Sequence, residues 1–119
     1  MWLLLALFTK HFIVDFPLQT KYQWSNKGKY GHPGGLLHAG LHGIATAVVL
    51  LFFIHYVDVA IVFGIVDAII HYHIDWAKMN LNNKMKWEPD TSEKFWWLLG
   101  FDLYLHALTY IGLVALLRI

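Results

Sequence analysis

The chain has 119 residues, a formal net charge of +1, no cysteine and 58% hydrophobic residues. This length holds one domain, residues 1–119, and the mean hydropathy of +0.49 exceeds that of an ordinary soluble domain. The lack of cysteine excludes disulfide bonds and thiolate ligands, so a metal site would have to use imidazole, carboxylate or water.

Four apolar segments follow one another along the chain. Most of them approach 20 residues, the length at which a helix crosses a hydrocarbon core of about 30 Å. The first is shorter, so we expect it to tilt or to continue past Pro17 along the interface, and its uncharged start argues against a signal peptide. We predict an all-α integral membrane protein, a bundle of four transmembrane helices. The segments are 1–16, 34–56, 57–76 and 95–119.

The distribution of lysine predicts the orientation of this bundle. The connection 17–33 contains three lysines and the connection 77–94 contains four, whereas residues 55–58 contain neither lysine nor arginine. The positive-inside rule places the two Lys-rich connections in the cytoplasm and both termini outside. We expect the bacterial inner membrane as the location, with Lys27 and Lys78 at the lipid headgroups.

Each apolar segment contributes one pair of His or Asp residues that are four positions apart. Four residues are just over one helical turn, so both members project from the same face of the helix. Ionisable groups inside a membrane are costly, about 2.5–3.5 kcal/mol for each Asp, and are usually functional. The pairs are His11/Asp15, His38/His42, His71/Asp75 and Asp102/His106.

The four pairs are predicted to lie at one depth. The topology puts all of them within about 15 Å of the cytoplasmic interface, and helical wheels align Thr46, Asp67 and Thr109 with them. A bundle would turn these polar stripes inward, either within one chain or between the chains of a homo-oligomer. Small residues are expected to let the helices approach closely, namely Gly40, Gly43, Gly64 and Gly100.

Imidazole and carboxylate groups together suit Zn, Fe or Mn. Eight such groups are enough for two ions, or for one ion with further residues that orient its ligands. A bound metal would also offset the cost of the buried aspartates. We predict Asp67 or Asp15 as a catalytic base, and eight metal ligands: His11, Asp15, His38, His42, His71, Asp75, Asp102 and His106.

The same motifs, in the same order, resemble the bacterial and phage membrane family called domain of unknown function 3307. The likeness covers nearly the whole chain, except that Leu103 stands where the family usually has Gln after the aspartate of the fourth motif. The segment Trp87-Glu88-Pro89 before Phe95-Trp96-Trp97 looks closest to phage members, which implies a phage origin. A more distant likeness to bacterial inner-membrane metal-dependent hydrolases implies hydrolysis by analogy.

We therefore expect a metal-dependent hydrolase that acts from the cytoplasmic face on a lipid or another amphiphile. Water activated by the metal would attack an ester or phosphoester, and the lysines would attract an anionic headgroup. We expect no nucleic-acid partner. The alternatives are a structural metal in a phage or bacterial membrane protein, a redox site, and a metal-free His/Asp proton relay. The apolar outer half of the bundle disfavours transport through it.

Overall fold

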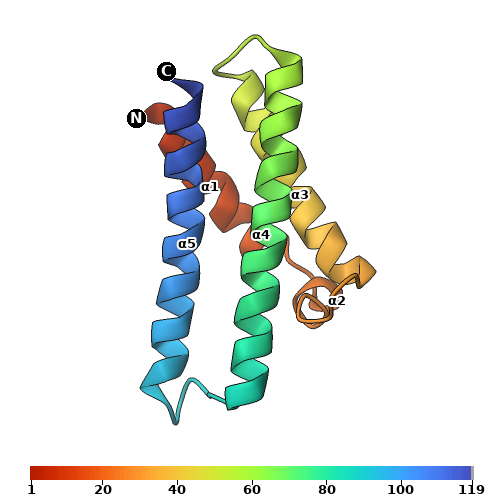
Figure 1. Cartoon of the computed structure of the whole chain (residues 1–119), viewed down its shortest axis with the longest axis vertical. Coiled ribbons are helices and arrows are strands. Elements are labelled where there is room, and N and C mark those ends of the chain that lie inside the picture. The colour runs from red at the N-terminus through yellow and green to blue at the C-terminus, as the bar shows by residue number, and fades with distance from the viewer. Residues whose placement is uncertain (119) are drawn as a thin grey trace.

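The computed structural model describes residues 1–118 and consists of helices joined by short connections (Figure 1). The described part contains no strand, so the prediction of an all-α protein is confirmed. The helices are α1 (Trp2–Asp15), α2 (Lys21–Trp24), α3 (Pro33–Leu51), α4 (Val57–Met85) and α5 (Glu93–Leu117).

The four longer helices form a closed ring. Helix α1 packs against α3 and α5, and α4 packs against the same two helices, so α1 lies diagonally opposite α4. The short helix α2 packs on α3. Figure 1 shows both termini and the α3–α4 turn at one end of the molecule, and α2 and the α4–α5 connection towards the other. The inward faces of four helices can therefore meet within a single chain.

Helices α3, α4 and α5 are each long and apolar enough to cross a membrane. Helix α1 has 14 residues, which corresponds to about 21 Å and is short for a span. The structure thus supports a membrane protein with three candidate spans, and a fourth crossing by α1 stays a prediction.

Helix α4 is longer than the apolar pattern predicted. The third apolar segment was expected to end at residue 76, whereas α4 continues to Met85 and stops at Lys86, which has a left-handed backbone conformation with φ 55°. No proline or glycine occurs between residues 77 and 85, so the helix can continue after the apolar stretch has ended. The added turns carry Lys78 towards the start of α5.

The connection between α1 and α3 folds back against the bundle. Thr20 begins α2 with a capping box, in which its hydroxyl accepts from the Gln23 N–H. His32 caps α3, which has Pro33 at its first position. The Asn80 side chain on α4 donates to the Gly28 carbonyl at 2.7 Å. The connection is therefore held against α3 and α4.

Two glycines bring α3 and α4 into close contact. A Cβ atom added at Gly43 would lie 2.6 Å from the Gly64 carbonyl oxygen, and one added at Gly64 would lie 2.5 Å from the Gly43 carbonyl oxygen. The predicted close approach is therefore confirmed at these two positions. It is wrong for Gly40 and Gly100, where an added Cβ would meet nothing within 4 Å.

The interior has an apolar part and a polar part. The side chains of Leu3, Leu7, Leu50, Tyr110 and neighbouring residues pack near the chain ends, and the polar part lies farther along the bundle. Apolar side chains also cover the outer surface, as at Ile44 and Ile69. A polar interior inside an apolar surface is the arrangement expected of a membrane bundle.

Candidate metal centre

The four predicted pairs converge in the interior of the bundle. All eight side chains are buried, and the most exposed of the eight residues, Asp15, has 8% of its surface accessible. They come from α1, α3, α4 and α5, so every helix of the ring contributes one pair. Their His and Asp atoms fall into three groups that could each hold a metal ion.

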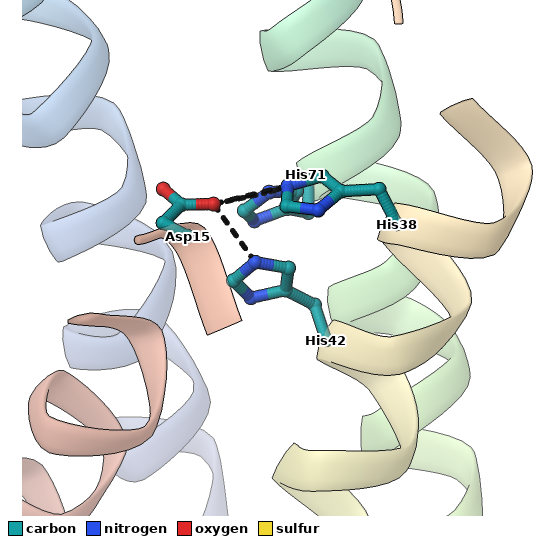
Figure 2. A group of neighbouring side chains, drawn as sticks. All are labelled: Asp15, His38, His42 and His71. Atoms are coloured by element: carbon teal, nitrogen blue, oxygen red, sulfur yellow. Dashed lines mark hydrogen bonds and ion pairs between the residues drawn. The ribbon is translucent and has the colours of Figure 1, made fainter. Parts of the chain in front are cut away.

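The first group joins Asp15 of α1 to three histidines. Asp15 Oδ1 lies 3.0 Å from Nε2 of both His38 and His42, and 3.7 Å from Nε2 of His71 (Figure 2). The Nε2 atoms of His38 and His71 are 3.3 Å apart. The close packing at Gly43 and Gly64 brings α3 and α4 together here, where the rings of His42 and His71 stack at 3.6 Å.

The second group lies between α4 and α5. His106 Nε2 is 3.4 Å from Asp75 Oδ1 and 3.3 Å from Asp102 Oδ1. Asp75 also reaches the first group, because its other oxygen, Oδ2, lies 3.2 Å from His71 Nε2 and 3.3 Å from His38 Nε2. Asp75 thus connects the two groups through its two oxygens.

The third group joins His11, His71 and His106. His11 Nδ1 lies 2.8 Å from the Tyr110 hydroxyl, and His11 Nε2 lies 2.9 Å from Asp15 Oδ2. The Nε2 atom is buried and has no well-aligned hydrogen bond. A polar partner on one ring nitrogen with the other nitrogen left over is typical of metal-ligating histidines.

The second group fits a metal ion best. Asp75 Oδ1, Asp102 Oδ1 and His106 Nε2 are all buried without a hydrogen-bond partner, although buried polar atoms are normally paired. Zinc–ligand bonds of about 2.0–2.2 Å imply that tetrahedral ligand atoms lie about 3.3–3.6 Å apart. The two measured separations from His106, 3.4 and 3.3 Å, meet this requirement.

Three lysines enter the same polar core, each bound to one aspartate. Lys10 Nζ lies 2.8 Å from Asp67 Oδ2, Lys27 Nζ lies 2.9 Å from Asp75 Oδ2, and Lys78 Nζ lies 2.8 Å from Asp102 Oδ2. In the last two pairs the lysine occupies Oδ2 and leaves Oδ1 for the second group.

The expectation that Lys27 lies at the headgroups is therefore wrong, whereas that for Lys78, whose side chain is 20% exposed, stays a prediction. Lys27 is only 6% exposed, because the connection 17–33 folds back beneath the bundle and inserts this side chain. Lys78 reaches Asp102 because α4 extends beyond its apolar part. Lys10 was absent from the predicted site, although its place directly before His11 in an apolar segment was a signal.

The lysines also constrain how many ions the core can accept. Asp15, Asp67, Asp75 and Asp102 carry four negative charges and the three lysines carry three positive ones, which leaves −1 if the histidines are neutral. One divalent ion would change this balance to +1, and two would make it +3. Uncompensated buried charge is costly, so the balance favours one ion over two.

Lys10 determines the hydrogen bonding of His42. An ammonium group has three donors, and Lys10 Nζ faces Asp67 Oδ2, the His42 carbonyl at 3.2 Å and His42 Nδ1 at 3.3 Å. Because Nδ1 accepts a hydrogen bond from the Lys10 ammonium group, the proton of the neutral ring lies on Nε2. In this arrangement His42 donates to Asp15 Oδ1 and has no lone pair directed at an ion.

The predicted base Asp67 lies behind His42 and not among the three groups. Its Oδ2 accepts from Lys10 and from the Thr46 hydroxyl at 2.5 Å, so the wheel alignment of Thr46 placed it correctly. Thr109 instead donates to the carbonyl of Leu105 in its own helix. Tyr110 takes the inward position, which the four-residue spacing of Asp102 and His106 could have indicated.

The fold and the site define a helical membrane protein with a buried His/Asp centre able to hold a metal ion. The sequence matches the model of the family described as "Protein of unknown function (DUF3307)" over residues 3–119, and the chain belongs to this family. Comparisons with curated proteins and with solved structures give no match. The function therefore has to be argued from the site.

Proposed function

We propose that this protein binds one divalent transition-metal ion (Zn, Fe or Mn) inside the membrane and uses it to hydrolyse an ester or phosphoester of an amphiphile. The main observation in support of metal binding is that three potential ligand atoms, on Asp75, Asp102 and His106, have no hydrogen-bond partner. Their positions on α4 and α5 are fixed by ion pairs to Lys27 and Lys78. His11 and His71, which group with His106, are the further ligands.

The chemistry assigned to the site is hydrolysis. A bound ion supplies Lewis acidity to the reacting bond and activates water. The water oxygen forms a bond to carbon or phosphorus, the bond to the leaving alcohol oxygen breaks, and that oxygen takes up a proton. Asp15 is the acceptor for the proton released by water, because it has no lysine partner and its oxygens face the histidines of the centre.

Metal binding is tested by elemental analysis of the protein, purified in detergent without a histidine tag. We expect about one equivalent of Zn, Fe or Mn per chain in the wild type, and a loss of most of it in an Asp102→Asn/His106→Gln variant. The matched control is His73→Gln, which changes an exposed histidine of α4 outside the three groups. A wild type without stoichiometric metal after growth in metal-replete medium overturns the proposal.

The reaction is tested with a panel of amphiphilic esters and phosphoesters in water enriched in oxygen-18. Hydrolysis places one heavy oxygen atom in the acid or phosphate product of the metal-loaded protein. Asp15→Asn should abolish this incorporation without removing the metal. If the metal is present but no substrate is hydrolysed faster than by the Asp102→Asn/His106→Gln variant, the metal is structural.

We also propose that α1 crosses the inner membrane as a fourth, tilted span, with both termini outside. The common position of the termini and the α3–α4 turn at one end of the bundle supports this topology (Figure 1). Reporter fusions after Met1 and after Arg118 test it. A cytoplasmic signal from either fusion contradicts it.

A further inference from the structure

Two adjoining cavities lie between α4 and α5 on the side of the candidate centre. The smaller one has a volume of about 130 Å³ and is lined by Lys78, Asp102 and apolar side chains that include Ala77 and Leu98. The larger one has a volume of about 350 Å³ and is lined by Trp24 and by further residues of α4 and α5. Lys78 and Leu98 line both cavities, so the two share a wall.

The smaller cavity reaches a ligand of the candidate centre. Asp102 lies in its wall, binds Lys78 through Oδ2 and faces His106 through Oδ1. The groove between α3 and α4 has a larger volume of about 380 Å³, but glycine, alanine and aliphatic side chains line it and none belongs to the three metal groups. A molecule between α4 and α5 therefore lies next to the centre, and one in the α3–α4 groove does not.

The lining of the α4–α5 cavities is apolar except at a few positions. In the smaller cavity the polar residues are Lys78 and Asp102. Lys78 has the most exposed side chain of the three core lysines, 20% against 6% and 7% for Lys10 and Lys27. Its ammonium group can thus contact a bound molecule without leaving the aspartate, whereas the ammonium groups of the other two lysines are enclosed.

We propose that the cleft between α4 and α5 binds an anionic phospholipid, with a hydrocarbon chain along the apolar wall and the headgroup phosphate at Lys78. The apolar wall suits a chain that enters sideways from the bilayer, and the lysine supplies a charge complementary to the phosphate. The inference rests on the proposed function, because it names the substrate class of the same centre. The phosphoester would then lie beside Asp102, the ligand that the cavity reaches.

Native mass spectrometry of the detergent-purified protein tests the proposal. The probes are phosphatidylglycerol and phosphatidylcholine with identical chains. We expect one phosphatidylglycerol to remain bound to the wild type with at least about tenfold preference over phosphatidylcholine. Leu98→Trp fills the shared wall and should reduce this binding about tenfold or more. The matched control is Ile61→Trp, which fills the α3–α4 groove instead and should leave binding unchanged.

The role of the lysine is tested separately. Lys78→Gln should abolish the preference for phosphatidylglycerol, and Lys78→Arg should restore it. Equal retention of phosphatidylglycerol by the wild type and Leu98→Trp, or an unchanged preference in a folded Lys78→Gln variant, overturns the proposal. Metal content is measured on the same samples. A variant that loses the lipid but keeps the metal has a defect in the cleft and not in the metal centre. If the wild type binds the lipid but contains no metal, the proposed function is overturned and the lipid site is not.

Discussion

Replacement of Lys10 by methionine is expected to be one of the most destabilising single changes in this protein. Lys10 is 6% exposed and Asp67 is 1% exposed, and their charged atoms are 2.8 Å apart. Methionine keeps much of the side-chain volume but leaves the carboxylate with only the Thr46 hydroxyl as its partner. Removal of one member of a buried ion pair costs about 3–5 kcal/mol, because the remaining charge stays buried.

The free energy of unfolding is measured by titration with sodium dodecyl sulfate in mixed micelles. Lys10→Met should lower it by about 3–5 kcal/mol. Asp67→Asn in the same chain should recover most of that loss, since the amide removes the unpaired charge and can still accept from Thr46. A cost for Lys10→Met below about 1 kcal/mol, the value typical of exposed pairs, would refute the reasoning, as would a double variant no more stable than the single one.

Three further predictions concern the packing and the ligands. Gly43→Ala should lower the free energy of unfolding by about 1–3 kcal/mol, because its Cβ would lie 2.6 Å from the Gly64 carbonyl oxygen. Gly40→Ala is the control and should cost little, since its Cβ would meet nothing within 4 Å. Equal costs in the same detergent titration would contradict the close contact. Tyr110→Phe removes the hydroxyl that contacts His11 Nδ1 and should weaken metal affinity about 10–100-fold. The affinity is measured by competition with a chelator, and an unchanged value excludes His11 from the ligands. Removal of the metal by dialysis against a chelator should lower the thermal midpoint, because an ion that binds only the folded state stabilises it; the Asp102→Asn/His106→Gln variant should show no such shift.

Much of the candidate site follows from local sequence. A spacing of four residues in a helix places two side chains on one face whatever the rest of the fold does. The two members of each pair therefore point the same way from their helix, in His11/Asp15, His38/His42, His71/Asp75 and Asp102/His106. The cost of ionisable groups in lipid then requires those faces to turn inward. The motifs alone thus imply that the four pairs converge.

Helical spacing could not predict which of these residues form each of the three possible metal groups. Wheel positions give a direction around one helix axis, but not the distance or height of a neighbouring helix. The contact of Asp15 with both histidines of α3, and of Asp75 with His106 of α5, depends on how the helices pack. The same limit explains why Asp67, which shares a face with Asp75, pairs with Lys10 instead of joining a metal group.

The helical class, the apolar spans and the inward direction of the His/Asp pairs follow from the order of the amino acids alone, because they depend on hydropathy and on helical periodicity. Which atoms are left for a metal depends instead on the packing of the whole chain. Lys10, Lys27 and Lys78 occupy aspartate oxygens on other helices, and these pairings leave the remaining oxygens free. They join residues between 24 and 57 positions apart, and no local pattern specifies contacts over that separation.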